Sequence, residues 1–303
     1  MTGVNLGRSM PILASRGCPY QCTFCSNPVM WGRLWSPRPP ADVIAEMEDY
    51  IERYQATNFD FYDLTAIVRK DWIVEFTNLV IEKNLNITWQ LPSGTRSEAI
   101  DSEVTALLYK SGCRYINYAP ESGSEAVLQR IKKVINKDRM VESMRSAIKN
   151  GMKVKGNFIL GFPGETYREV LDTYIFLIKL AVIGVHDVSV FPFTPYPGSS
   201  LFKELQEKGV IKLDDDYLYA LSQYTDMWIP PKSYSDHISD RALGFLTLFA
   251  MLMFFGISFL SRPVRFISLV YNLCTRQPQT KLEAALDRII EKRFILVNAS
   301  SQS

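Results

Sequence analysis

Apolar runs with the composition of β-strands alternate with helical patterns along the first two-thirds of this 303-residue chain. Such alternation is typical of βα units, whose strands lie side by side in a parallel sheet. Six apolar runs carry the strand pattern: 10–14, 58–62, 87–91, 115–119, 154–160 and 185–191. The helical patterns cover 41–55, 71–84, 102–110, 138–150, 166–180 and 199–208. The sequence therefore predicts an α/β fold of six βα units, with its chemistry on the loops that follow the strands.

The composition limits the size and the partners of this fold. A hydrophobic content of 47% and a net charge of +2 fit one large core with an appendage. Lysine and arginine alternate with acidic residues along the predicted helices, so no basic patch stands out. Because nucleic-acid binders usually carry such a patch, we expect no nucleic-acid partner.

Three of the five cysteines stand close together directly after the first predicted strand. Cys18, Cys22 and Cys25 have the spacing C-x3-C-x2-C, with the aromatic residue Phe24 before the third cysteine. A loop this short can turn three thiolates toward one point, and thiolates are the ligands of iron–sulfur clusters. Three protein ligands on a four-iron cluster leave one iron open, and an open position separates a reactive metal site from a structural one.

Three other interpretations of the cysteines stay open. A structural zinc site usually takes four Cys or His ligands, and His186 and His237 lie far along the chain without a Cys or His at ligand spacing. A disulfide suits a secreted protein, but residues 1–10 lack the apolar segment of a signal peptide. An electron-transfer cluster needs a fourth cysteine, which Cys113 or Cys274 could supply.

The cysteine motif resembles the signature of the radical S-adenosylmethionine (SAM) superfamily, whose C-x3-C-x2-C loop holds a [4Fe–4S] cluster. In that family the free iron binds SAM, and an electron from the cluster cleaves SAM to methionine and a 5′-deoxyadenosyl radical, which abstracts hydrogen from the substrate. The resemblance implies that Cys18, Cys22 and Cys25 bind the metal and that Phe24 lies beside SAM. The stretch 15–20 is most similar to the branch that includes cobalamin-dependent radical SAM enzymes and methylthiotransferases.

The resemblance also implies a division of the chain. We expect a partial (β/α)6 TIM-like barrel, the radical SAM core, over residues 1–208. A helical, hydrophobic C-terminal extension is expected over residues 209–303. Members of the closest branch often carry a cobalamin-binding domain before the barrel, but only 17 residues precede Cys18. Either the enzyme works without cobalamin, or the chain is part of a longer protein or receives cobalamin from a separate one.

The ends of the second and third predicted strands carry polar residues that relatives use near SAM. Asp63 could accept from an ammonium group, and Thr65 could donate to a carboxylate. An Asx turn explains Asp63 equally well. Arg96 follows the third strand, and its fork of donors suits a carboxylate. A surface arginine at the start of a helix is the alternative for this residue.

The ends of the fourth and fifth strands resemble two further family motifs. The segment 119–125, A-P-E-S-G-S-E, is similar to G-x-E-S-G-S, which implies that Glu121 and Ser122 contact SAM. The alanine and proline before Glu121 depart from that pattern, and a buried structural carboxylate is the alternative. The segment 161–166, G-F-P-G-E-T, is similar to G-x-P-G-E-T. There the resemblance places Gly161 and Gly164 in a tight turn and Ile159 against adenine.

Two residues in these segments have expected structural roles. Cys113 precedes the fourth strand, and we interpret it as a small buried residue rather than a metal ligand. Thr166 stands at the start of a predicted helix, where a threonine side chain can cap the free backbone N–H groups.

Residues 242–260 contain no charged side chain and lie between Arg241 and Arg262. The segment is long enough to cross a membrane. One crossing would put at least as much positive charge on the far side as on the near side, which argues against that topology. A helix buried against the barrel, a helix in the membrane surface and a true span therefore stay open. A closing amphipathic helix is expected over 281–293.

Together these patterns predict a cytoplasmic radical SAM enzyme that contacts the membrane through 242–260 if that segment is interfacial. The expected cofactors are a [4Fe–4S] cluster and SAM, with an electron donor such as flavodoxin or ferredoxin. The expected reaction is methyl transfer, cyclisation or another C–H functionalisation of a small, apolar or lipid-like molecule. A non-catalytic iron–sulfur protein or a membrane-associated binding protein is the alternative.

Overall fold

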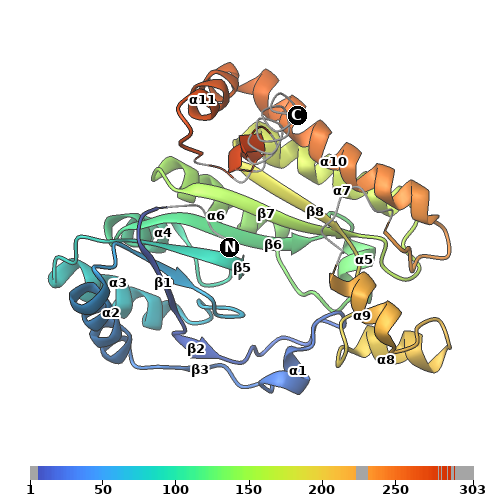
Figure 1. Cartoon of the computed structure of the whole chain (residues 1–303), viewed down its shortest axis with the longest axis horizontal. Helices are drawn as coiled ribbons and strands as arrows, with labels where there is room; N and C mark the ends of the chain where they lie inside the picture. The colour runs from blue at the N-terminus through green and yellow to red at the C-terminus, as the bar shows by residue number, and fades with distance from the viewer. Residues whose placement is uncertain are drawn as a thin grey trace, which may run out of the picture.

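The computed structural model describes residues 6–222 and 231–290, apart from 279, 281, 285, 288 and 289. Its main sheet has six parallel strands and is open, with the first strand at one edge and the last strand at the other (Figure 1). The strands follow one another in chain order: β1 (Ser9–Ile12), β4 (Asn58–Phe61), β5 (Thr88–Thr95), β6 (Cys113–Glu121), β7 (Lys153–Leu160) and β8 (Asp187–Pro192). The predicted α/β fold of six βα units is confirmed.

Each of the six predicted helices is present within a few residues of its expected bounds. They are α2 (Pro40–Tyr54), α3 (Lys70–Glu82), α4 (Ser102–Lys110), α6 (Lys137–Lys149), α7 (Tyr167–Ile183) and α8 (Ser200–Glu207). The cap expected at Thr166 is also present: its side chain accepts from the N–H of Glu169, whose carboxylate accepts from the N–H of Thr166. Such a reciprocal capping box satisfies two otherwise free backbone donors.

Several short elements had no clear sequence signal. They are the two-stranded antiparallel ribbon β2 (Ser15–Arg16) and β3 (Ser36–Pro37) and the helices α1 (Asn27–Met30), α5 (Glu125–Arg130) and α9 (Asp215–Ser222). Strand β5 also continues beyond its predicted end, through Pro92 and Gly94. These residues normally weaken a strand, and a shift of register between Leu91 and Thr95 accommodates them here.

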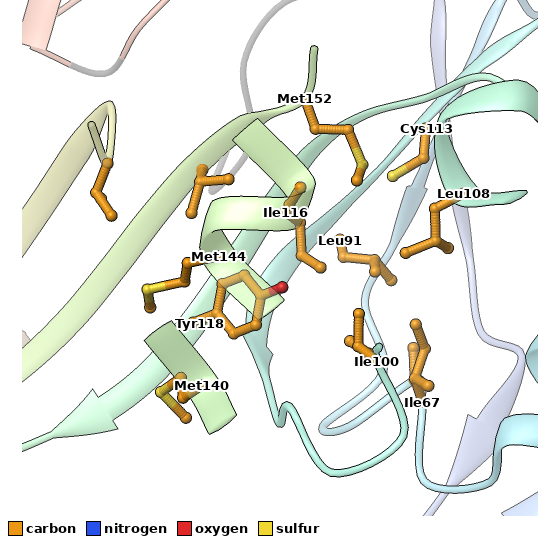
Figure 2. Close-up of a cluster of buried hydrophobic side chains, with 14 of the residues drawn as sticks. Ile67, Leu91, Ile100, Leu108, Cys113, Ile116, Tyr118, Met140, Met144 and Met152 are labelled. Atoms are coloured by element: carbon orange, nitrogen blue, oxygen red, sulfur yellow. The ribbon is translucent and has the colours of Figure 1, made fainter. Parts of the chain in front are cut away.

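The two faces of the sheet differ in polarity because alternate residues of a strand point to opposite sides. One face packs against the helices in the hydrophobic core, where Leu91, Ile116 and Tyr118 of β5 and β6 contact Met140 and Met144 of α6 (Figure 2). The other face carries buried polar side chains. They are Asp60, Gln90, Asn117, Lys155 and Asp187. The inside of the partial barrel is therefore polar, which suits a ligand with charged groups.

Two long helices form the C-terminal extension: α10 (Asp240–Ser261) and α11 (Pro263–Cys274). Helix α10 lies along α7 and the edge strand β8 (Figure 1). Among the described residues, α10 is the one helix long and apolar enough to cross a membrane, by length and composition. Its inner face, with Leu243, Ala250 and Phe254, is buried in the core. Most of the helix predicted over 281–293 lies outside the described residues.

Candidate active site

The three cysteines of the motif lie on the loop between β2 and α1, directly after the first strand of the sheet. Cys18, Cys22 and Cys25 are all half-buried, and none forms a disulfide. Gly17 makes the entry to this loop possible: its φ is +77°, and a Cβ atom there would lie 2.0 Å from the carbonyl oxygen of Leu34. A side chain at this position would therefore push the two arms of the loop apart.

Backbone contacts attach the cysteine loop to distant parts of the barrel. The N–H of Thr23 donates to the carbonyl oxygen of Ile131, and the carbonyl oxygen of Thr23 accepts from the N–H of Leu201. The Ser26 hydroxyl donates to the carbonyl oxygen of Pro197 at 2.8 Å. The loop therefore touches segments that follow β6 and β8, so the folded barrel fixes its position.

Asn27, which the sequence did not single out, holds the loop from within. Its side-chain amide donates to the carbonyl oxygens of Cys18 and Gly32. Its backbone N–H donates to the sulfur of Cys25 at 3.4 Å. One buried residue therefore fixes the first and the third cysteine of the motif relative to each other.

Two cationic side chains lie near the thiols. Burial raises the pKa of Cys18, Cys22 and Cys25, whereas the charge of Lys133 lowers the pKa of all three. Arg96 lowers the pKa of Cys18 and Cys22 in the same way. Positive charge beside a thiol favours the thiolate, which is the form that binds metal.

Arg96, predicted to follow the third strand, is buried at the cysteine loop. Its guanidinium group lies 3.3 Å from the centre of the Tyr20 ring, in a cation–π contact. It also donates to the carboxylate of Glu98 and to the carbonyl oxygen of Val134. The alternative of an exposed arginine at a helix start is therefore wrong. The cation–π contact of Arg96 thus holds Tyr20, and its hydrogen bonds hold Glu98 and the segment after α5.

Glu121, at the end of β6, forms an ion pair with Lys133 that the sequence did not indicate. The two charged groups are 3.0 Å apart, and their side chains are only 9% and 7% exposed. Glu121 has a φ of +66°, unusual for a residue other than glycine. The backbone at Glu121 is thus turned so that its carboxylate contacts Lys133. The negative charge of Glu121 raises the pKa of Cys22, and the positive charge of Lys133 lowers it.

Asp63 and Thr65 follow β4 and are both buried. The Asp63 carboxylate accepts from the Ser15 hydroxyl at 2.5 Å and from the N–H of Ala14 at 3.2 Å. Burial raises the pKa of Asp63, and these hydrogen bonds lower it. Asp63 thus supports the chain just before the cysteine loop. The Thr65 hydroxyl is different, because it has no hydrogen-bond partner within the described part of the chain.

Ser122 is fully buried, and its hydroxyl contacts the hydroxyl of Thr173 on α7 at 3.1 Å. The same oxygen accepts from the N–H of Ser124. Its hydrogen-bonding groups are therefore directed at the helix and the turn. In this arrangement Ser122 ties the end of β6 to α7.

The turn after β7 places Gly161 against α10. The φ of Gly161 is +86°, and a Cβ atom there would lie 2.6 Å from a methyl group of Leu243. Gly164 also has a positive φ but has open space around it, with its nearest neighbour 4.0 Å away. The buried Glu165 closes the turn by accepting from the N–H groups of Gly161 and Phe162.

A row of aromatic rings leads away from the cysteine loop. Phe24 contacts Phe162 with ring centres 5.7 Å apart, and Phe162 contacts Phe193 at 5.0 Å. Phe193 in turn contacts Tyr234 at 5.8 Å. Ile159 packs against the same hydrophobic cluster. Phe24 therefore begins a continuous row of aromatic rings beside the third cysteine.

Within 6–222 and the described part of 231–290, no three His, Cys, Asp or Glu side chains are grouped closely enough to hold one metal ion. In a [4Fe–4S] cluster each thiolate would bind a different iron, so the three thiols would not have to meet at one atom. Cys113 is enclosed by Leu91, Leu108 and Met152 (Figure 2), and burial raises the pKa of its thiol to about 12. This thiol belongs to the core, as we expected.

The fold and the cysteine loop together define a partial parallel barrel with a thiolate site at the carboxyl ends of its strands. The family model of the Radical SAM superfamily matches residues 12–177, which is more than half of the chain. The chain therefore belongs to the radical SAM superfamily. Membership implies a [4Fe–4S] cluster and SAM as cofactors.

Curated relatives share this part of the sequence. An uncharacterized methyltransferase of Pyrococcus horikoshii is 31% identical over 193 residues, which are 63% of this chain and 41% of the relative. The anaerobic magnesium-protoporphyrin IX monomethyl ester cyclase of Rubrivivax gelatinosus is 28% identical, over 64% of this chain and 34% of the enzyme. The chain thus spans between a third and a half of the length of these relatives.

Solved structures confirm the fold. The TsrM methyltransferase of Kitasatospora setae, with cobalamin and a [4Fe–4S] cluster bound, matches 65% of this chain and 36% of its own at a TM-score of 0.56 and 16% identity. The cobalamin-dependent S-adenosylmethionine radical enzyme OxsB matches 95% of this chain and 50% of its own at a TM-score of 0.60 and 13% identity. Because the second match covers nearly the whole chain, most of the C-terminal extension lies within the shared fold.

Proposed function

We propose that this chain carries the radical-generating site of a radical SAM enzyme, in which Cys18, Cys22 and Cys25 hold a [4Fe–4S] cluster. The observation that carries the proposal is three half-buried thiols on one anchored loop, with Lys133 and Arg96 beside them. The cations favour the thiolate form that iron requires. When bound, the cluster supplies the electron that cleaves SAM into methionine and a 5′-deoxyadenosyl radical.

The residues around the loop divide into two groups in this proposal. Phe24, Ile159 and the glycine turn at Gly161 and Gly164 would provide an apolar wall for adenine. The unpartnered Thr65 hydroxyl would donate to the methionine carboxylate, because a buried hydroxyl without a partner costs free energy that a ligand can recover.

The second group would act by positioning. Asp63 and Ser122 use their polar atoms to hold the cysteine loop and the end of β6. Arg96 holds Tyr20, and Glu121 is held by Lys133. Asp63 and Arg96 would thus fix the cysteine loop and the chain before it, whereas Ser122 and the pair of Glu121 with Lys133 would fix the end of β6.

The substrate would be a small molecule with a large apolar part. Two features support this: α10 is strongly apolar, and relatives carry the names of methyltransferases and of a porphyrin ester cyclase. The reaction would be methyl transfer, cyclisation or another C–H functionalisation, in that order of preference. We further propose a cytoplasmic enzyme that takes electrons from a flavodoxin or ferredoxin and contacts the membrane surface through residues 242–260.

Anaerobic reconstitution with iron and sulfide, followed by SAM and dithionite, tests the proposal. We expect iron uptake and release of 5′-deoxyadenosine by the wild-type protein and by Cys113→Ala, whose thiol lies in the core. The Cys22→Ala protein should lose both. A reconstituted cluster that never consumes SAM would instead support a non-catalytic iron–sulfur protein.

A further inference from the structure

The outward face of α10 is apolar from Phe245 to Leu260. Phe245, Leu252 and Leu260 are 66%, 62% and 84% exposed, and they recur with the spacing of one helix face. A helix at the surface of a soluble protein normally presents polar residues to water. The outward face of α10 therefore indicates a surface that another molecule covers.

Helix α7 adds a second apolar stripe beside α10. Its exposed apolar residues follow one another at intervals of three or four: Tyr167, Leu171, Ile175, Ile178 and Val182. The two helices are in direct contact, because the Tyr174 hydroxyl donates to the carbonyl oxygen of Leu246 at 2.8 Å and the Tyr174 ring lies 5.7 Å from that of Phe249. The two stripes therefore form one surface.

Helix α11 extends this surface beyond the end of α10. Its exposed apolar residues are Val264, Phe266, Ile267, Val270 and Tyr271. We refer to the exposed apolar residues of α7, α10 and α11 as the apolar face. Large exposed apolar patches of this kind mark interaction sites.

The only two charged residues between 242 and 275, Arg262 and Arg265, are directed inward. Arg262 donates to the carbonyl oxygens of Ala181 and Val182 at the end of α7. Arg265 donates to those of Gly184 and Val185. Basic side chains at these positions satisfy free carbonyl groups at a helix end. They attach α10 and α11 to the barrel and leave the outward side of these two helices without charge between residues 242 and 275.

The attachment of α10 to the barrel distinguishes a helix that spans a membrane from a helix that lies in the membrane surface. A spanning helix would have to leave α7 and β8 and expose Leu243, Ala250 and Phe254, which are now fully buried. A helix that lies flat keeps these contacts and still places its outward face in lipid. The geometry therefore favours contact in the plane of the membrane surface.

A cavity lies between the apolar face and the far end of the aromatic row. Its volume is about 730 Å³, and α10 contributes Leu248 and Met251 to its wall. Leu248 is also exposed on the apolar face. At its other side the cavity is lined by Phe193 and Tyr234, the end of the aromatic row that begins at Phe24.

We propose that the apolar face binds the surface of a lipid bilayer and that the cavity beside Leu248 receives an apolar substrate from the lipid. A bilayer fits better than a protein partner for two reasons. Between residues 242 and 275 the face has no outward charged group that a specific protein interface would pair, and a protein covering Leu248 would close the route to the cavity. This proposal rests on the proposed function, which it deepens by stating how the protein meets the membrane and where the apolar substrate enters, whereas the cluster and the cleavage of SAM do not depend on bilayer binding.

Flotation of the detergent-free protein with vesicles of phosphatidylcholine and phosphatidylglycerol tests this proposal. The test variant is Ile175→Glu with Leu252→Glu, which puts a charge on each of the two stripes. The matched control is Tyr54→Glu with Tyr109→Glu, which adds the same charge at exposed residues of α2 and α4. We expect the wild type and the control to float, and the test variant to bind vesicles about tenfold more weakly or worse.

Two results would overturn the proposal: a wild-type protein that stays with the soluble fraction, or a test variant that floats as well as the wild type. Gel filtration tests whether a second copy of the chain covers the apolar face instead of lipid. A wild-type dimer that does not float, and that the test variant turns into a monomer, would assign the face to a second copy of the chain. Release of 5′-deoxyadenosine without vesicles should be equal in all three proteins, which separates failure of this proposal from failure of the proposed function.

Discussion

Replacing Lys133 by methionine probes the buried charge pair at the centre of the site. Methionine keeps much of the length of the side chain but leaves the Glu121 carboxylate buried without its cation. Since the side chains of Lys133 and Glu121 are 7% and 9% exposed and their charged groups are 3.0 Å apart, water screens them little. Breaking such a pair costs about 3–5 kcal/mol. We therefore predict that Lys133→Met lowers the free energy of unfolding by about this amount.

Urea unfolding under anaerobic conditions measures this loss. The double variant Lys133→Met with Glu121→Gln removes both charges and should lose less than the sum of the single losses, by about 1–3 kcal/mol. Lys208→Met is the matched control, because Lys208 pairs with Glu204 at the surface with 62% exposure. Its effect should stay within about 1 kcal/mol.

A Lys133→Met protein as stable as the Lys208→Met protein would refute this reasoning. It would show that solvent screens the carboxylate of Glu121 when its partner is removed. Additive losses in the double variant would likewise show that the two charges do not interact.

Three further substitutions test the turn after β7. Burial raises the pKa of Glu165 to about 7 from an ordinary value of 4.5, so the folded protein keeps a proton there that the unfolded chain releases. The wild type should therefore lose roughly 3 kcal/mol of unfolding free energy relative to Glu165→Gln as the pH rises from 4.5 to 7. Urea unfolding at several pH values measures this change. A difference in unfolding free energy between the two proteins that stays constant across this pH range would contradict the prediction. Gly161→Ala should lower the free energy of unfolding by about 1–3 kcal/mol more than Gly164→Ala, because both positions have positive φ but only Gly161 meets Leu243. Equal melting temperatures for the two alanine variants would show that α10 moves away from the turn without cost.

Much of the fold follows from local patterns. The strands could be predicted because each is a short apolar run between helical patterns. Among the helices, the predicted bounds of α4, 102–110, agree with the structure at both ends. Strand β5 was predicted too short because its second half contains Pro92 and Gly94. A strand can retain such residues only where its neighbours tolerate a shifted register, and that depends on β6 rather than on the sequence of β5.

The site was less predictable than the fold. The three cysteines stand together in the sequence, so their spacing alone indicated a cluster loop. Lys133 has no local motif, and its role arises because the backbone at Glu121 turns the carboxylate toward it. Asn27 resembles any polar residue near a turn, and only the closed loop shows that it joins Cys18 to Cys25. Glu165 was visible within the glycine motif, but its burial could not be read from sequence.

The outward face of α10 illustrates a different limit. The apolar composition of 242–260 was evident, yet composition alone could not separate a buried helix from an interfacial or spanning one. Our proposal of an interfacial helix rests on the partners of Arg262 and Arg265, which lie about eighty residues earlier, at the end of α7 and directly after it. Long-range contacts of this kind leave no periodic signal.

The most direct test of the account is the amount of 5′-deoxyadenosine released by the anaerobically reconstituted protein with SAM and dithionite. Our account predicts release by the wild type and by Cys113→Ala, and none when Cys18, Cys22 or Cys25 is changed to alanine. A wild-type protein that takes up iron yet leaves SAM intact would contradict it, and so would a single-alanine variant at any of these three positions that still cleaves SAM.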